Sequence, residues 1–333
     1  MSNYSNFISE TIQQTKSFEA TLPLMAQTGG SQFFIQPNQT DKVCVFFHGF
    51  TATPEQFAVI GKAFYQAGYN VLIPLLPGHG IAGDWNKDNP PPLPEDKHIY
   101  QKFGLHWLQV AQDLGNKVIV GGLSGGSTLA AWLALECPEQ IDRTLVFAPY
   151  LSGSNKVVDL FVRFFNIYFQ WRTKPELAHF GYDGFLMPAL RVFLDMGNDV
   201  LEQAQKTLAS PMLIVSSESD RAVGNREHKD LFEATVQFQP KSWYISFDRE
   251  WDIPHNMMTV AEGNENLNLL ITLSLAYVKS DLTWIEITEI CDSIVKGSPF
   301  DTIINQLHLR QSVAPELFTI TGIIDSSIQE LKH

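Results

Sequence analysis

The chain has 333 residues, enough to bury a sizeable core as one large domain or two modest ones. With 44% hydrophobic and 18% charged residues, its composition is that of an ordinary globular protein. The net charge of -13 argues against a nucleic-acid partner, because a phosphate backbone would be repelled rather than neutralised.

Signals for secretion or membrane insertion are not evident. Residues Met1 to Ile8 lack the basic start and the apolar run of a secretory signal. The longest apolar tracts, Val157 to Trp171 and Leu267 to Val278, are shorter than the ~20 residues that a membrane-spanning helix needs. The three cysteines are widely spaced, which does not suggest a disulfide framework. We therefore expect a cytoplasmic protein without a transmembrane segment.

Short apolar segments alternate with longer amphipathic ones along the chain. The short segments are rich in β-branched and apolar residues, which predicts strands that are buried on both faces. The predicted strands are Lys42 to Phe47, Tyr69 to Pro74, Lys117 to Gly121, Arg143 to Ala148, Pro211 to Ser216 and Trp243 to Phe247. Because strands that alternate with helices form a parallel sheet covered on both faces, we predict an α/β architecture.

Helices are predicted between these strands. The first begins with Thr53 as the cap, Pro54 at the first position and Gln56 three residues after the cap, which is a capping-box pattern. It should end at Gly68, since glycine commonly follows the last turn of a helix. The others are predicted from Tyr100 to Leu114, from Ser124 to Pro138 and from Arg226 to Ala234.

The alternation stops between residues 150 and 208, where aromatic-rich helical sequence predominates and no convincing strand is found. We interpret 150–208 as a helical cap inserted into a single α/β domain that spans residues 1–333; a pair of ordinary core helices is the alternative. Residues 281–333 extend past the expected last helix. We interpret this amphipathic tail as a C-terminal helical extension that packs on the core or mediates homo-oligomer formation.

The main functional motif is Gly122-Leu-Ser124-Gly-Gly126. Gly-x-Ser-x-Gly alone is a weak signal, but here it closes a predicted strand and opens a predicted helix, as a nucleophile elbow requires. In so sharp a turn the residues two positions from the serine must lack Cβ atoms, and Gly122 and Gly126 meet this condition. We therefore predict Ser124 to be a nucleophile.

A serine nucleophile needs a base, and the base needs a carboxylate that orients it. Glu218 and Asp220 follow the predicted strand Pro211 to Ser216, at the edge of the sheet where catalytic groups gather. We prefer Asp220, because it lies on the loop directly before a helix, and keep Glu218 as the alternative. His255 is the only histidine in the loop after the last predicted strand, so we predict it as the base. His228, on the preceding helix, is predicted to be a surface residue.

An oxyanion hole requires two donors aimed at the carbonyl oxygen. Gly125 offers its backbone N–H because it follows the nucleophile, and Phe50 offers another from the loop His48-Gly49-Phe50-Thr51 after the first predicted strand. His48 precedes the nucleophile and is predicted to order this loop. No HExxH, paired CxxC or cluster of histidines and carboxylates suggests a metal, and no cofactor is expected.

With these motifs in this order, the chain resembles the bacterial carboxylesterases and monoacylglycerol lipases of the α/β-hydrolase superfamily, a group that includes the serine-aminopeptidase-like hydrolases. The resemblance runs from about Val43 to Lys279. Its motifs are His48-Gly49-Phe50-Thr51, Leu76-Pro77-Gly78-His79-Gly80, Gly122 to Gly126, Asp220 to Val223 and Pro254-His255. It implies the α/β-hydrolase fold and acyl hydrolysis under a helical cap. Gly125 departs from the pattern, because such elbows usually carry a larger residue, often Met or Leu, after the serine.

We therefore predict a serine hydrolase that cleaves carboxylic esters through an acyl-enzyme intermediate. Six aromatic residues are candidates to shape a pocket for an apolar acyl chain of a small substrate: Phe161, Phe164, Phe165, Tyr168, Phe169 and Trp171. The alternative, which we expect for at least half of them, is that they only pack within the cap. Amide or thioester hydrolysis, or lyase or haloperoxidase chemistry, remains open on the same fold. A non-enzymatic interaction protein is a further alternative, although such a protein has no need of Ser, Asp and His in this order.

Overall fold

The computed structural model describes the chain except residues 1–2, 27–28, 155, 172–174 and 322–333. One sheet has the strand order β1-β3-β2-β4-β5-β8-β9. β1 pairs antiparallel with β3, and the other neighbours pair in parallel. The strands are β1 (Gln32–Phe34), β2 (Lys42–Phe47), β3 (Asn70–Ile73), β4 (Lys117–Leu123), β5 (Arg143–Phe147), β8 (Met212–Ser217) and β9 (Trp243–Phe247). All six predicted strands are confirmed, and they form the parallel part of this sheet.

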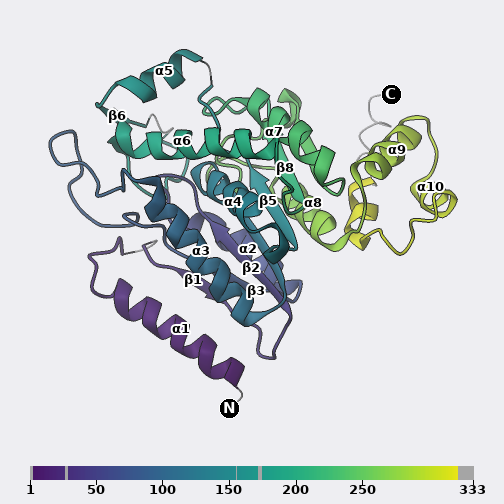
Figure 1. Ribbon diagram of the computed structural model, residues 1–333, viewed down its shortest axis with the longest axis horizontal. Helices are drawn as coiled ribbons and strands as arrows, with labels where there is room; N and C mark the ends of the chain where they lie inside the picture. Colours follow the sequence, from purple (N-terminus) through teal and green to yellow (C-terminus); the bar gives the residue numbers. More distant parts are fainter. Residues whose placement is uncertain (1–2, 27–28, 155, 172–174, 322–333) are drawn as a thin grey trace.

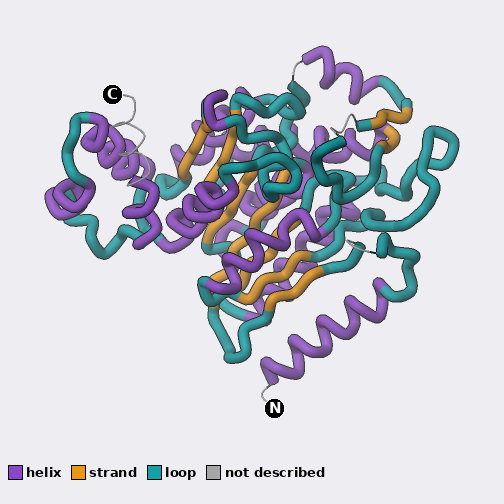
Figure 2. The backbone as a smooth tube through the Cα atoms, turned by 180° about the vertical axis from the view of Figure 1, so that it is seen from behind, coloured by secondary structure: helices purple, strands orange, loops and turns teal. Residues whose placement is uncertain are grey.

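Helices cover both faces of the sheet (Figures 1 and 2). α2 (Ala58–Gln66) contacts α8 (Leu267–Lys279), whereas α3 (Lys97–Leu114) contacts α4 (Gly125–Glu136). α4 is central, because it packs against the sheet on one side and against α6 (Met187–Ala204) on the other. Every residue of α4 except the last, Glu136, is buried. This burial on all sides explains why the helix, which is rich in Ala and Leu, shows no polar face.

The start of the first predicted helix differs from the expectation. Pro54–Phe57 forms a 3-10 turn before α2, and the Thr53 side chain makes no capping hydrogen bond. The Oε1 atom of Gln56 instead accepts a hydrogen bond from the Gly49 N–H at 2.8 Å. The predicted capping box is therefore wrong, because the loop after β2 uses the glutamine.

Residues 150–208 contain α5 (Lys156–Phe164) and α6, and also two short strands, β6 (Tyr168–Gln170) and β7 (Gly184–Leu186), which pair antiparallel. The prediction that this segment holds no strand is wrong, since a strand of three residues is too short to show an alternating pattern. α5, β6 and α6 lie together at the top of Figure 1, to one side of the sheet. That this segment acts as a cap remains a prediction.

The two ends of the chain add helices outside this core. α1 (Asn3–Glu19) lies along the lower edge of the molecule in Figure 1, and α9 (Trp284–Val295) and α10 (Phe300–Gln306) project to the right. The C-terminal extension contacts the core: the Trp243 Nε1–H donates to the Leu282 carbonyl at 3.0 Å. Residues 322–333 of the predicted extension lie outside the described residues.

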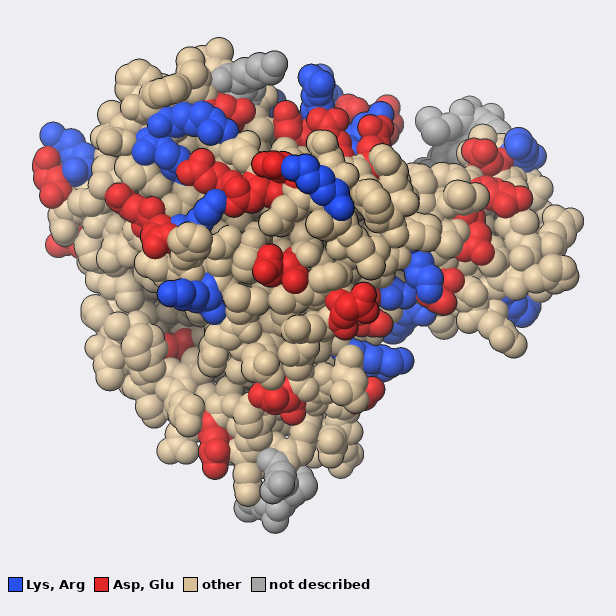
Figure 3. Space-filling view, in the orientation of Figure 1, with Lys and Arg blue, Asp and Glu red and all other residues tan. Residues whose placement is uncertain are grey.

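On the face shown in Figure 3, acidic and basic side chains are interspersed, and its described part shows no continuous basic patch. None of the helices within the described residues is both long and apolar enough to cross a membrane.

Candidate active site

Ser124 lies in the turn between β4 and α4. Its φ of 55° and ψ of -119° place it in a conformation that residues with a Cβ atom rarely adopt. The Ser124 N–H donates to the Phe147 carbonyl at 3.0 Å, which holds the turn against β5. A Cβ on Gly122 would lie 2.4 Å from the Gly126 carbonyl, and one on Gly126 would lie 2.2 Å from the Phe47 oxygen. These contacts confirm that both positions require glycine.

Two further non-glycine residues nearby have positive φ. Thr51 (67°) follows β2 and Ala148 (41°) follows β5. β2, β4 and β5 are neighbours in the sheet, so three such residues, with Ser124, lie at the carboxyl ends of adjacent strands. The chain also passes from β3 on one side of β2 to β4 on its other side. Ligands bind at such a reversal of strand order, and backbone strain gathers at functional sites.

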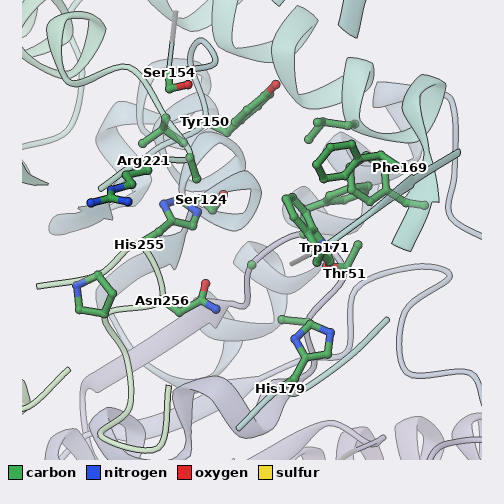
Figure 4. Close-up of a pocket in the computed structure, with 18 of the residues that line it drawn as sticks. Thr51, Ser124, Tyr150, Ser154, Phe169, Trp171, His179, Arg221, His255 and Asn256 are labelled. Atoms are coloured by element: carbon green, nitrogen blue, oxygen red, sulfur yellow. The ribbon is translucent and has the colours of Figure 1, made fainter. Parts of the chain in front are cut away.

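His255 and Asp220 come from two loops at this same edge. The His255 Nδ1–H donates to Asp220 Oδ2 at 2.7 Å. The Asp220 side chain is buried, and its Oδ1 accepts from the Ala222 N–H at 2.8 Å. His255 lines the same pocket as Ser124, and Figure 4 shows the two side chains close together. The structure thus brings the three predicted residues to one place.

The electrostatics of this pair favour a protonated imidazole beside a carboxylate. Burial alone would raise the pKa of the Asp220 carboxyl, but the charge of His255 and the hydrogen bond between them hold that pKa below its usual value. Burial alone would lower the pKa of His255, but the charge and the hydrogen bond of Asp220, with a contribution from Glu262, raise it. His255 is therefore suited to accept a proton.

The alternative residues at this edge are placed differently. The Glu218 side chain is 55% exposed and has Arg249 as its charged neighbour, at 3.9 Å. His228 is fully buried, so its predicted surface position is wrong. It lies on α7 (Asn225–Phe238), with Nδ1 3.0 Å from Ser216 Oγ and Nε2 2.8 Å from the Pro149 carbonyl. Burial lowers the pKa of His228 to about 4, so it is neutral at pH 7.

Two buried histidines brace the loop that carries Phe50. The Leu76 N–H donates to His48 Nε2, and the Thr51 N–H donates to His79 Nε2, each at 3.1 Å. Since both Nε2 atoms accept, each ring carries its proton on Nδ1, which donates to a backbone carbonyl at 3.0 Å. Burial lowers the pKa of His79 to about 4 and that of His48 well below its usual value. His48 therefore orders the loop as a neutral ring, in agreement with the prediction.

An aromatic ring from α6 fills the space beside Gly125. A Cβ on Gly125 would lie 3.0 Å from the ring of Phe193, which is fully buried. The Phe193 ring also packs edge-on against Phe50, with centroids 5.5 Å apart. Phe193 thus occupies the place that a larger residue after the serine would take, which gives a structural reason for the glycine. Gly125 is the first residue of α4, so its N–H has no partner within the helix.

Ser124 and His255 open into a pocket of about 660 Å³ (Figure 4). Of the six aromatic residues predicted to line it, three do so: Phe161, Phe169 and Trp171. The other three do not line the pocket, as the alternative expects for half of the set: Phe164, Phe165 and Tyr168. Phe164, near the end of α5, is instead 72% exposed to solvent.

Glu262 is a site residue for which the sequence offers no clear signal. It is buried and lines the pocket, with Oε1 2.9 Å from Gln56 Nε2 and Oε2 3.0 Å from Thr259 Oγ1. Burial raises the pKa of Glu262 to about 7 against the effect of these hydrogen bonds.

Within the described residues, no three His, Cys, Asp or Glu side chains are grouped so that they could hold a metal ion.

Part of the sequence is similar to known hydrolases. Residues 38–179 match the family model described as serine aminopeptidase, S33. The thermostable monoacylglycerol lipase of Bacillus sp. (strain H-257) is 30% identical over 112 residues, which cover 34% of this chain and 42% of the lipase. The putative esterase/lipase 3 of Mycoplasma pneumoniae is 29% identical over 126 residues, covering 37% of this chain and 43% of that protein. The match therefore spans less than half the length of either relative.

Solved structures extend the likeness over most of the chain. A structure from work on the metagenome-derived lipolytic enzymes LipS and LipT has a TM-score of 0.62 at 16% identity, covering 76% of this chain and 98% of that chain. The monoacylglycerol lipase of Paleococcus ferrophilus has a TM-score of 0.56 at 17% identity, with coverages of 74% and 97%. At these identities the likeness concerns the fold. The strand order, the turn at Ser124 and the likeness to these structures show that the chain has the α/β-hydrolase fold, and its residues 38–179 are similar to the serine aminopeptidase, S33, family.

Proposed function

We propose that the protein is a serine hydrolase that cleaves carboxylic esters, with Ser124 as nucleophile, His255 as base and Asp220 as the orienting acid. The observation that carries this proposal is the 2.7 Å hydrogen bond from His255 to the buried Asp220, beside a strained Ser124 in one apolar pocket. The similarity to a monoacylglycerol lipase and a putative esterase/lipase favours an ester over an amide as the substrate.

In the first step, Ser124 Oγ attacks the ester carbonyl while His255 Nε2 takes the serine proton. The hydrogen bond from Nδ1 to Asp220 keeps the ring in the tautomer that leaves Nε2 free to accept. The N–H groups of Phe50 and Gly125 stabilise the negative charge on the carbonyl oxygen. The alcohol then leaves with the proton from His255, and water releases the acid from the acyl-enzyme by the same route.

The pocket indicates the kind of acyl group. Its aromatic and aliphatic wall, which includes Phe161, Phe169 and Leu190, suits an apolar chain or ring. A series of p-nitrophenyl esters of increasing chain length should therefore show a clear optimum in kcat/KM. Covalent labelling without turnover of any ester in the series would favour the amide or thioester alternative.

The nucleophile can be tested by covalent labelling. A fluorophosphonate should add to the protein, as read by intact-mass spectrometry, and Ser124→Ala should abolish the addition. Ser127→Ala is the matched control, because it removes a hydroxyl from α4, the helix that follows Ser124, and this hydroxyl has no hydrogen-bond partner among the described residues. It should label like the wild type. Equal labelling of Ser124→Ala and the wild type would disprove the assignment.

The rate should fall on the acid side, because His255 must be neutral to accept the serine proton. Burial lowers its pKa, but Asp220 outweighs burial and raises the pKa above the usual 6.5. We therefore expect the acid limb of kcat/KM to have its midpoint above 6.5, with the rate lost as the pH falls through that value. Initial rates between about pH 5 and pH 9 measure this limb. A midpoint below that of free histidine would contradict the predicted role of Asp220.

A further inference from the structure

Gln56 and Glu262 connect the two loops that carry the proposed oxyanion donor and the proposed base. Gln56 Oε1 accepts from the Gly49 N–H at 2.8 Å, and Gly49 directly precedes Phe50. Gln56 Nε2 donates to Glu262 Oε1 at 2.9 Å, and Glu262 lies in the segment after His255. Both side chains are buried, and both line the pocket. A direct hydrogen-bonded path therefore joins residues that are far apart in the sequence.

The chemistry of the groups fixes the direction of this path. The Gly49 N–H can only donate, so the amide oxygen of Gln56 must face it and the amide nitrogen must face Glu262. The Glu262 oxygen at that end must therefore accept. Its other oxygen accepts from Thr259 Oγ1 at 3.0 Å, and Thr259 Oγ1 in turn accepts from the Glu262 N–H at 3.1 Å. An ionised carboxylate satisfies all of these contacts.

The charge of Glu262 also acts on His255. Burial lowers the pKa of His255, whereas Asp220 and Glu262 both raise it. His228 is a further titratable neighbour, which burial keeps neutral at pH 7. Arg221 lines the same pocket and adds a positive charge there. Burial raises the pKa of Glu262 itself to about 7, against its hydrogen bonds to Gln56 and Thr259 and the charge of His255. Glu262 thus changes its charge in the pH range where His255 would work.

We propose that Glu262 is a positioning residue that acts on both halves of the site. Through Gln56 it holds the Gly49-Phe50 loop in the geometry that presents the Phe50 N–H. Its carboxylate also favours the imidazolium that forms when His255 takes the serine proton. This inference rests on the proposed function, because it assigns roles around the proposed base and the proposed oxyanion donor.

Three variants separate the hydrogen bond from the charge. Glu262→Gln keeps an oxygen that can accept from Gln56 but removes the charge. Glu262→Leu removes both, and Gln56→Met removes the link while leaving the carboxylate. Glu316→Gln is the matched control, since it neutralises a partly buried carboxylate that pairs with Lys279 in the C-terminal part of the chain.

For Glu262→Gln, kcat should fall about 3- to 10-fold while KM changes less than about twofold, because the loss lies in the transition state. The acid limb of kcat/KM should move to lower pH by roughly half a unit, because His255 loses a negative neighbour. Glu262→Leu and Gln56→Met should lose about 100-fold in kcat, since the donor loop is no longer held. Glu316→Gln should match the wild type in both readouts.

Thermal unfolding tests whether each variant is folded. If Glu262→Leu is not, the comparison of Glu262→Gln with Gln56→Met decides the test. A wild-type protein that hydrolyses esters, together with a Glu262→Gln variant of unchanged kcat and acid limb, would overturn this proposal alone. A wild type that hydrolyses none of the esters would overturn the proposed function and this inference with it.

Discussion

Asp220→Asn should lower kcat for ester hydrolysis by about 10⁴-fold and leave KM nearly unchanged. The Asp220 carboxylate accepts the Nδ1–H of His255 at 2.7 Å, which leaves Nε2 unprotonated and able to take the serine proton. An asparagine amide can donate to Nδ1 instead, and the ring then carries its proton on Nε2, facing Ser124. The geometry of the loop survives but the tautomer is wrong. Initial rates with the best p-nitrophenyl ester measure the effect.

Glu218→Gln is the matched control for this substitution, because it neutralises the other carboxylate of the same loop. The Glu218 side chain is 55% exposed beside Arg249, so its loss should leave kcat within about twofold of the wild type. If Glu218→Gln lost activity and Asp220→Asn retained it, the acid would have been assigned to the wrong residue. Loss of activity in both variants with a lowered midpoint of thermal unfolding would indicate damage to the loop instead.

Gly125→Met should destabilise the fold, although Met is common after the serine in related elbows. Its Cβ alone would lie 3.0 Å from the fully buried Phe193 ring, and overpacking of this kind costs about 1–3 kcal/mol. Phe193→Ala alone should cost about 3–5 kcal/mol, because it leaves a cavity. In the double variant the methionine can fill that cavity. The loss of stability in the double variant should therefore be about 2 kcal/mol smaller than the sum of the losses in the two single variants. Urea unfolding measures all four proteins.

Ile304→Ala provides the control for this comparison, because it also empties a fully buried site, but on α10 in the C-terminal extension. Its loss should add to that of Gly125→Met within about 0.5 kcal/mol. If the losses of Gly125→Met and Phe193→Ala were also additive, the ring of Phe193 would not occupy the space of a side chain at position 125.

The sequence was most informative where the signal is local. The six parallel strands are buried on both faces, so their runs of β-branched and apolar residues predict them directly. The strand before Ser124 and the helix after it together predict the sharp turn at that residue. β1, β6 and β7 were missed because each is only three residues long. Strands of that length depend on their pairing partners rather than on a pattern of their own.

The other errors concern contacts between distant parts of the chain. The sequence of α7 is polar enough to suggest a surface helix, yet His228 is buried between Ser216 and Pro149. Gln56 fits the pattern of a capping box, but its side-chain oxygen accepts a hydrogen bond from the Gly49 N–H instead. The link from Gln56 to Glu262 joins residues 206 positions apart. A single sequence carries no signal for such pairs, because neither residue is unusual in its own segment.

Thr51, Ser124 and Ala148 have consequences for heat resistance. A residue with a Cβ atom in so rarely populated a conformation costs on the order of 1–3 kcal/mol, against a total stability of about 5–15 kcal/mol. Glycine would relieve much of this cost at each position, at the carboxyl ends of three adjacent strands. Selection for thermostability alone would therefore favour replacing Ser124, the proposed nucleophile. If Ser124 is the nucleophile that we propose, glycine cannot replace it, and a more thermostable variant must gain its stability elsewhere in the fold.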